Sequence, residues 1–259
     1  MSDYSNYSIL EEAEPARVPI WREVMWPAEW ALLRASPAYY GIGVPKGDRS
    51  EAVVIIPGFM GSDFYLMEFR FWLRRMGYKA YQSRIGRNTE CLNISGERIT
   101  KTVTRAYERT GKKVHLIGHS LGGILARGVA RTHPEMVASV VTMGSPFRAI
   151  RAHPLVLTAG DFIRSTIRSR HPSDEIKADC FTGYCSCTYV QALHHDLPEE
   201  VAQRAIYTKT DGVVDWQYCI NDHPERDIEV KGTHVGLAFH AGVYGHVAHF
   251  YDDLAKGNA

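Results

Sequence analysis

The feature that most constrains this chain is a serine between two glycines, at the junction of an apolar segment and a helix-like one. Gly118, Ser120 and Gly122 form a G-x-S-x-G motif directly after the apolar residues 113–117, and residues 121–131 have helical periodicity. The spacing predicts a tight strand-to-helix turn that exposes the serine hydroxyl at the end of a strand. A serine that only capped the helix would not require glycines on both sides.

Segments with strand and helix character alternate on both sides of this motif. The predicted strands are residues 51–56, 78–83, 113–117, 137–143, 205–208 and 227–230, and the predicted helices are 64–76, 96–109, 121–131 and 243–254. This alternation predicts an α/β fold with about six mostly parallel strands flanked by helices. Residues 1–50 are expected to form an N-terminal helical segment packed on a core domain of residues 51–259, which carries a cap-like insertion over about 147–203.

The bulk composition excludes several function classes. The chain has 259 residues, 45% of them hydrophobic, and a formal net charge of +1, which disfavours binding to nucleic acid. No apolar run reaches the roughly 18 to 20 residues that span a bilayer, and the polar residues 1–14 lack the pattern of a signal peptide. The expectation is a cytoplasmic protein without an integral membrane segment. The oligomeric state stays open.

No cofactor or metal is expected. Neither a G-x-G-x-x-G motif nor a phosphate-binding loop pattern is present. The five cysteines include a cluster of three, but their spacing does not match a zinc site. Packed thiols and one local disulfide from this cluster to Cys219 both remain possible interpretations of Cys91, Cys180, Cys185, Cys187 and Cys219.

A serine nucleophile requires a base and an orienting acid, which follow it in the chain in the order acid, then histidine. Asp211 and Asp215 both follow the strand predicted at 205–208, and Asp211 is preferred because it lies on the first turn after the strand. His234 is the predicted base because, among twelve histidines, it lies on a loop directly after the last strand.

Two backbone N–H groups are predicted to form an oxyanion hole. Phe59 follows the first strand within the sequence PGFMG, and Leu121 is the residue after the serine. Apolar residues near the strand ends, Met60, Phe147 and Trp216, are candidates for an apolar substrate pocket, with a role as plain core residues as the alternative.

Together these motifs resemble the α/β-hydrolase superfamily, particularly small bacterial lipases and esterases. The similar segments are 57–61, 118–123, 144–146, 210–214 and 232–237, with Pro57 in place of the usual histidine. The resemblance implies the α/β-hydrolase fold, a Ser120-His234-Asp211 triad, and cleavage of a carboxylic ester through an acyl-enzyme. Residues 1–50 depart from the family because they lack its two leading strands.

Two other functions fit the same motifs. An acyltransferase would form the same acyl-enzyme and pass the acyl group to an alcohol, amine or thiol. A binding protein built on a hydrolase scaffold would not need the triad. In each case the expected partner is a small ester or acyl compound with an apolar portion.

Overall fold

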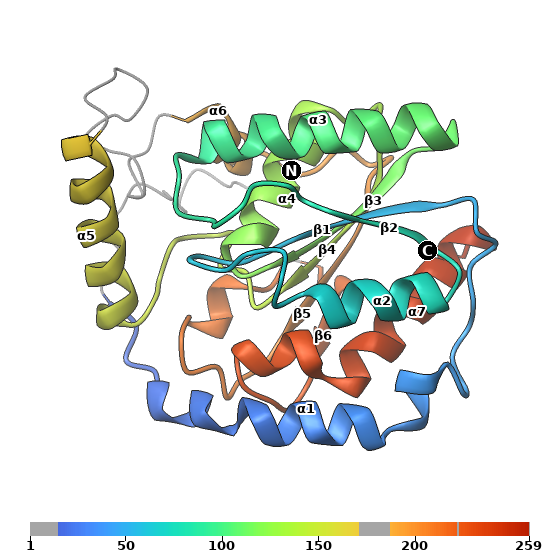
Figure 1. The fold of residues 1–259 in the computed structure, drawn as a ribbon, viewed down its shortest axis with the longest axis horizontal. Helices are drawn as coiled ribbons and strands as arrows, with labels where there is room; N and C mark the ends of the chain where they lie inside the picture. Colours follow the sequence, from blue (N-terminus) through green and yellow to red (C-terminus); the bar gives the residue numbers. More distant parts are fainter. Residues whose placement is uncertain (1–14, 171–186, 222, 259) are drawn as a thin grey trace.

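A single parallel sheet forms the centre of the described protein (Figure 1). The computed structural model describes residues 15–170, 187–221 and 223–258. Its strands are β1 (Ala52–Ile56), β2 (Lys79–Gln82), β3 (Val114–His119), β4 (Val137–Met143), β5 (Ala202–Tyr207) and β6 (Asp227–Glu229). They lie in the order β2-β1-β3-β4-β5-β6, and every neighbouring pair is parallel. The predicted α/β architecture of about six mostly parallel strands is therefore confirmed.

Helices cover both faces of this sheet. One face packs against α3 (Leu92–Thr110), α4 (Leu121–Thr132) and α6 (Thr188–Gln191), and the other against α2 (Met67–Arg75) and α7 (Ala241–Ala255). β1 shows why both faces need cover, since all five of its residues are buried. Val54 and Ile56 pack with the first group of helices, and Val53 and Ile55 with the second.

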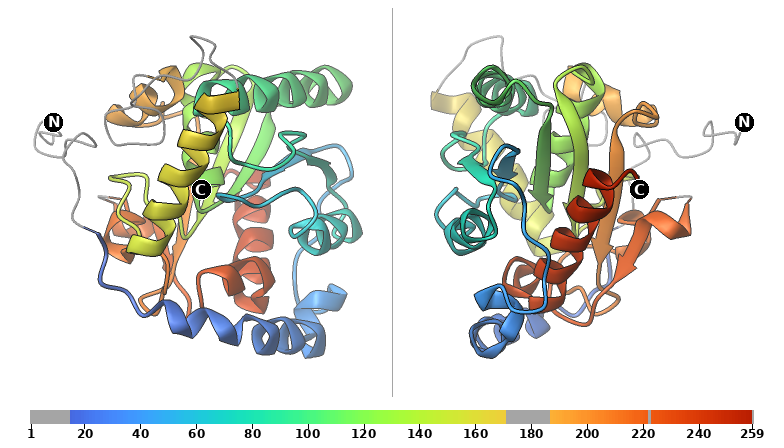
Figure 2. Two further views of the ribbon diagram at one scale, coloured as in Figure 1. Left: turned by 60° about the vertical axis from the view of Figure 1, so that its left-hand side comes forward. Right: turned by 90° about the vertical axis from the view of Figure 1, so that its right-hand side faces the viewer.

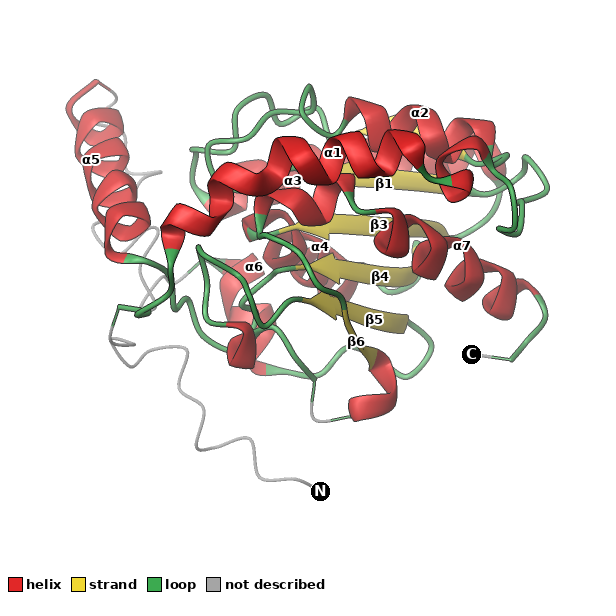
Figure 3. Ribbon diagram, turned by 90° about the horizontal axis from the view of Figure 1, so that it is seen from below, coloured by secondary structure: helices red, strands yellow, loops and turns green. Residues whose placement is uncertain are grey.

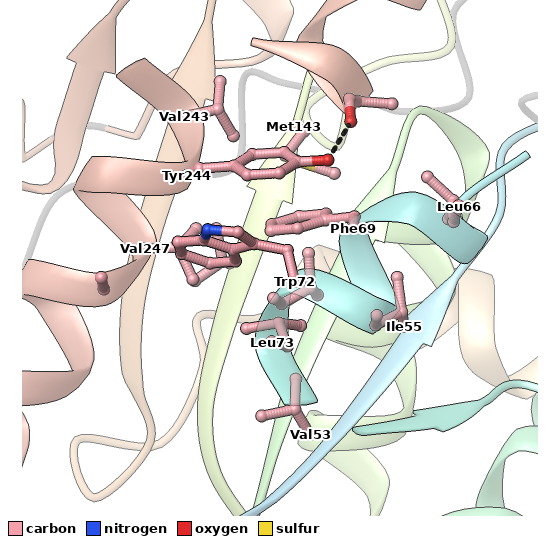
Figure 4. Packing of buried hydrophobic residues seen from close by; sticks show 14 of the residues in the cluster. Val53, Ile55, Leu66, Phe69, Trp72, Leu73, Met143, Val243, Tyr244 and Val247 are labelled. Carbon is pink, nitrogen blue, oxygen red and sulfur yellow. Dashed lines mark hydrogen bonds between the residues drawn. The ribbon is translucent and has the colours of Figure 1, made fainter. Parts of the chain in front are cut away.

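Three aromatic side chains between α2 and α7 form the centre of the second face (Figure 4). Phe69 stacks on Tyr244 with ring centroids 4.4 Å apart, and Trp72 lies 4.7 Å from the same ring. The Tyr244 hydroxyl donates a hydrogen bond to the Ala238 carbonyl at 3.1 Å, so its polar end is satisfied in the core. Complete burial of each large side chain contributes about 1.5–3 kcal/mol.

The described part of the N-terminal segment is helical, with η2 (Ile20–Met25), α1 (Trp26–Ala35) and η3 (Pro37–Tyr40). Pro27 lies in the first turn of α1, where its missing N–H is not needed. The segment runs along the outside of the molecule (Figures 1 and 3). Trp26 packs on Phe239 of η7 (Val235–Phe239), the short helix that follows the predicted histidine loop.

The chain between β4 and β5 contains α5 (Pro154–Arg170), which stands at the carboxyl end of the sheet (Figure 2). It is followed by α6 and η4 (Ala192–His194), and two further short helices, η5 (Trp216–Tyr218) and η6 (Pro224–Arg226), lie between β5 and β6. That this region acts as a cap remains a prediction. In the described part of the chain, no helix is both long and apolar enough to cross a bilayer.

The cysteine arrangement differs from the suggested disulfide to Cys219. Cys187 places its sulfur 3.2 Å from that of Cys91, at the start of α3. Cys219 is buried elsewhere, beside Ala152 and Val214, and forms no disulfide with any described residue. Cys180 and Cys185 lie outside the described residues.

Candidate active site

Ser120 occupies a strained turn between β3 and α4. Its backbone has φ 53° and ψ −126°, a combination that is unfavourable for a residue with a side chain. The turn is tight because backbone packs directly on its glycines. A Cβ atom on Gly118 would lie 2.3 Å from the Gly122 carbonyl oxygen, and one on Gly122 would lie 2.3 Å from the Ile56 oxygen. The G-x-S-x-G spacing therefore has the steric cause expected from the sequence.

The loops after β5 and β6 bring Asp211 and His234 together. Asp211 Oδ2 lies 2.7 Å from His234 Nδ1, and both residues are 3% exposed. Asp211 Oδ1 accepts hydrogen bonds from the backbone N–H groups of Val213 and Val214, both at 2.8 Å. The carboxylate is thereby fixed in orientation, and it favours the imidazole tautomer that carries a proton on Nδ1. Nε2 is then available as a proton acceptor.

The alternative acid, Asp215, has a different role. Its side chain accepts the Gln217 N–H at 3.1 Å as the N-cap of η5, and it lies 3.6 Å from Arg151 Nε. His240 likewise caps α7 through the N–H of Gly242. Of the two predicted acids, the structure therefore brings only Asp211 to the histidine.

Ser120 and His234 line one pocket with a volume of about 370 Å³. Around it are mainly apolar side chains from the loop after β1, from α5 and from the acid and histidine loops: Phe59, Met60, Leu155, Val156, Ala159, Val213 and Val235. Among the described residues, none forms a hydrogen bond with the Ser120 hydroxyl. Ser120 and the His234 imidazole are therefore related only by facing the same pocket. Hydrogen bonds of this kind often tighten only when substrate binds.

The two predicted oxyanion donors also border the pocket region. Phe59 lines it, and Leu121 begins α4 directly after Ser120. Neither backbone N–H is used in a hydrogen bond within the described part of the chain, as expected for donors that await a ligand. Asn88 fixes the loop after β1, since its side-chain amide donates to the Pro57 carbonyl at 2.8 Å and its backbone carbonyl accepts the Met60 N–H at 2.9 Å.

Two of the three predicted substrate residues lie elsewhere. Met60 lines the pocket, but Phe147 is buried against Ile124 with the Arg127 guanidinium 4.1 Å from its ring centroid. Trp216 stacks on Tyr207. These side chains found partners in the packing around β5, the alternative role that the sequence had left open.

A hydrogen-bond chain, which no sequence motif indicated, connects the loop after β1 to the loop that carries His234. We call the first the oxyanion loop, because it carries the predicted donor Phe59, and the second the histidine loop. The Gly58 N–H donates to the Tyr65 hydroxyl oxygen at 2.9 Å, and that hydroxyl lies 2.8 Å from His119 Nδ1. His119 Nε2 lies 2.8 Å from the backbone carbonyl of His234, which can only accept. His119 therefore carries its proton on Nε2, and Tyr65 donates to Nδ1. No motif marked Tyr65, whose role depends on the position of a histidine 54 residues away.

The pKa values of the two histidines are shifted in opposite directions. Burial lowers the pKa of His119 to about 3, so it is neutral at physiological pH. Burial also opposes protonation of His234, but the charge of Asp211, its hydrogen bond and the charge of Glu23 together raise the pKa of His234 above its ordinary value. The site thus favours an imidazolium at His234 only.

An open parallel sheet, a serine on a strained turn after its central strand and a buried aspartate-histidine pair define an α/β-hydrolase. Within that fold, the family model described as palmitoyl protein thioesterase matches residues 52–209. The chain belongs to this family. The match includes Ser120 and ends before Asp211 and His234.

Curated relatives are similar over part of the chain. A triacylglycerol lipase of Burkholderia plantarii is 32% identical over 145 residues, 51% of this chain and 40% of the lipase. One from Pseudarthrobacter phenanthrenivorans is 34% identical over 105 residues, 37% of this chain and 33% of the lipase. The chain thus matches less than half the length of either relative.

Solved structures support the fold. The lipase BlEst2 of Bacillus licheniformis in its propeptide form superimposes with a TM-score of 0.55 at 16% identity, covering 81% of this chain and 51% of that one. Est1E from Butyrivibrio proteoclasticus gives a TM-score of 0.50 at 15% identity, covering 82% and 92%. At these identities the likeness concerns the fold alone.

Proposed function

We propose that this protein is a serine hydrolase that cleaves carboxylic esters of apolar acids, with Ser120 as the nucleophile. The main support for the proposal is that Ser120 and His234 line one mostly apolar pocket, and that Asp211 Oδ2 lies 2.7 Å from His234 Nδ1. A strained serine, a histidine and a buried carboxylate in this order are the components of nucleophilic acyl transfer. The family and the curated lipases support the same reaction class.

In the proposed first step, the Ser120 oxygen forms a bond to the ester carbonyl carbon while His234 Nε2 takes the serine proton. Asp211 keeps the ring oriented and stabilises the imidazolium. The N–H groups of Phe59 and Leu121 bind the oxyanion, and loss of one such donor costs about 3–4 kcal/mol in comparable enzymes. The C–O bond then breaks, and His234 returns the proton to the leaving alcohol.

In the second step, water replaces the alcohol. His234 Nε2 removes a proton from water as the water oxygen attacks the acyl-enzyme carbonyl. The bond between the acyl carbon and the Ser120 oxygen then breaks, His234 returns the proton to that oxygen, and the acid is released. No cofactor is required for either step. The mostly apolar lining of the pocket favours an acyl chain over a charged or sugar-like acid.

The leaving group distinguishes two forms of this proposal. The curated relatives are named triacylglycerol lipases, which points to an oxygen ester, while the family description names a thioesterase. Both share the acyl pocket and the acyl-enzyme. Comparison of oxygen and thiol esters of the same acid therefore identifies the preferred leaving group, and added alcohol separates hydrolysis from acyl transfer.

Reaction with a fluorophosphonate probe tests the proposal. The wild-type protein is expected to be labelled and to hydrolyse p-nitrophenyl esters, with a preference that rises with acyl length until the pocket is full. Ser120→Ala should abolish both, whereas Ser165→Ala, on the exposed surface of α5, should abolish neither. Equal labelling of wild type and Ser120→Ala would refute the assignment of the nucleophile.

A further inference from the structure

One carboxylate outside the predicted triad contacts both loops that carry it. Glu23 Oε1, in η2, accepts the N–H of Gly212 at 2.9 Å and the N–H of His234 at 3.0 Å. Its Oε2 accepts the N–H of Val235 at 2.9 Å. We propose that Glu23 is a positioning residue, which holds the acid loop and the histidine loop in the register needed for the Asp211–His234 contact. This inference rests on the proposed function.

A second carboxylate from the same segment supports this arrangement. Glu29, one turn into α1, accepts the backbone N–H of Thr233 at 2.7 Å and the Thr233 hydroxyl at 2.6 Å. Glu23 and Glu29 therefore bind three successive residues, 233–235, centred on the histidine. Hydrogen bonds to an ionised acceptor are roughly twice as strong as neutral ones, so this stretch of backbone is firmly held.

The glycines of the acid and histidine motifs provide an independent observation. A Cβ atom on Gly212 would lie 2.8 Å from Glu23 Oε1, and one on Gly236 would lie 1.6 Å from Glu29 Oε2. Both carboxylates thus occupy the space that a side chain at these positions would need. These loop glycines and the N-terminal carboxylates fit together as one packing unit.

Glu23 also contributes charge. The groups that act on the His234 ring are the carboxylate of Asp211, the carboxylate of Glu23 and the neutral ring of His119, which lies 4.8 Å away between centroids. The negative charge of Glu23 favours the imidazolium that forms when Ser120 attacks. Loss of that charge should therefore lower the pKa of His234, in addition to any loss of loop register.

A set of variants separates the two contributions from a merely structural attachment of the N-terminal segment. Glu23→Ala removes the bridge and the charge, while Glu23→Gln removes the charge and retains an acceptor oxygen. Glu135→Ala is the matched control, because Glu135 is exposed and its side chain pairs with His133 away from both loops. The measurements are kcat and KM for a p-nitrophenyl ester across pH, the melting temperature, and the proton NMR resonance of the His234 ring.

We expect Glu23→Ala to lower kcat roughly 10- to 100-fold with KM changed by less than about twofold, as for other residues that orient a catalytic ligand. The acidic limb of its kcat/KM profile should move to lower pH. Glu23→Gln should show that shift with a smaller loss of kcat, and Glu135→Ala should behave as wild type. A variant that loses only melting temperature, with wild-type kcat and acidic limb, would overturn the proposal.

The NMR measurement keeps this inference distinct from the proposed function. The Nδ1 proton between His234 and Asp211 should be protected from exchange in wild type and in Glu135→Ala, and exposed in Glu23→Ala, whether or not the protein hydrolyses esters. Equal protection in the folded Glu23→Ala protein would refute the positioning role. A wild-type protein that resists fluorophosphonate yet shows this difference would refute the hydrolase assignment alone.

Discussion

His119 Nε2 donates a hydrogen bond to the backbone carbonyl of His234 at 2.8 Å, so the residue before the predicted nucleophile contacts the residue predicted as its base. The same ring meets the Tyr65 hydroxyl, which in turn accepts the Gly58 N–H beside the oxyanion loop. A neutral, buried histidine thus connects the nucleophile turn, the oxyanion loop and the histidine loop.

This connection makes Tyr65 a testable position. Tyr65→Phe leaves the Gly58 N–H and His119 Nδ1 without their partner, and each buried polar group left unsatisfied costs about 1–3 kcal/mol. We expect a lower melting temperature and roughly tenfold lower kcat through displacement of the oxyanion loop. Tyr107→Phe, at a partly exposed position on α3, serves as the control in parallel kinetic and thermal assays.

The Asp211–His234 pair predicts a large kinetic effect. Asp211→Asn should leave the fold intact but lower kcat/KM by roughly 10³- to 10⁴-fold, because an amide favours the wrong imidazole tautomer. Asp215→Asn should retain most activity, because asparagine can still cap η5 and the change mainly removes the charge that faces Arg151. Steady-state kinetics of both variants identify the acid that orients His234. A larger loss of kcat/KM in Asp215→Asn than in Asp211→Asn would assign that role to Asp215.

The raised pKa of His234 predicts a defined pH response. Since the base must be unprotonated, activity should fall with a slope of one as pH decreases through that raised pKa, above the ordinary histidine value of about 6.5.

Stability should change in the opposite direction. A pKa raised by folding adds stability that is fully present below the unfolded value and is lost as pH rises through the folded value. Urea unfolding of wild type and His234→Gln from pH 5 to 9 should therefore show a wild-type advantage that shrinks as pH rises. An advantage that grows with pH would contradict the direction of the shift.

The pocket lining predicts control of acyl length by α5. Ala159→Phe adds bulk beside Leu155 and Val156 and should shift the preferred p-nitrophenyl ester toward shorter acyl chains. Each lost methylene contact corresponds to about 1 kcal/mol or more of discrimination. Ser165→Phe adds the same ring on the exposed surface of α5 and should leave the acyl profile unchanged. If Ala159→Phe and Ser165→Phe had the same acyl-length preference, α5 would not control substrate selection.

The fold and most of the site could be predicted because their causes are local. β4 was predicted at its observed bounds, and the helix starting at Leu121 at its observed start, since apolar runs and helical periodicity depend on neighbouring residues. Strand β5 begins three residues earlier than predicted, because Ala202–Arg204 alternates buried and partly exposed residues and lacks a continuous apolar run.

The remainder of the site depends on contacts between distant parts of the chain. Glu23 and Tyr65 carry no motif, and their partners lie 211 and 54 positions away. Phe147 and Trp216 were predicted from their proximity to strand ends, but periodicity does not reveal that Arg127 and Tyr207 pack on them. Residues 171–186 of the predicted insertion lie outside the described structure.

The hydrogen bond between Glu23 and the His234 N–H also has a consequence for the order in which the protein folds. Glu23 is synthesised 211 residues before His234, and the family-matched residues 52–209 lie between them. A nascent chain can therefore assemble strands β1 to β5 before His234 has been synthesised. Contacts across such long sequence separations form slowly. During refolding, catalytic activity should therefore return later than the compact fold.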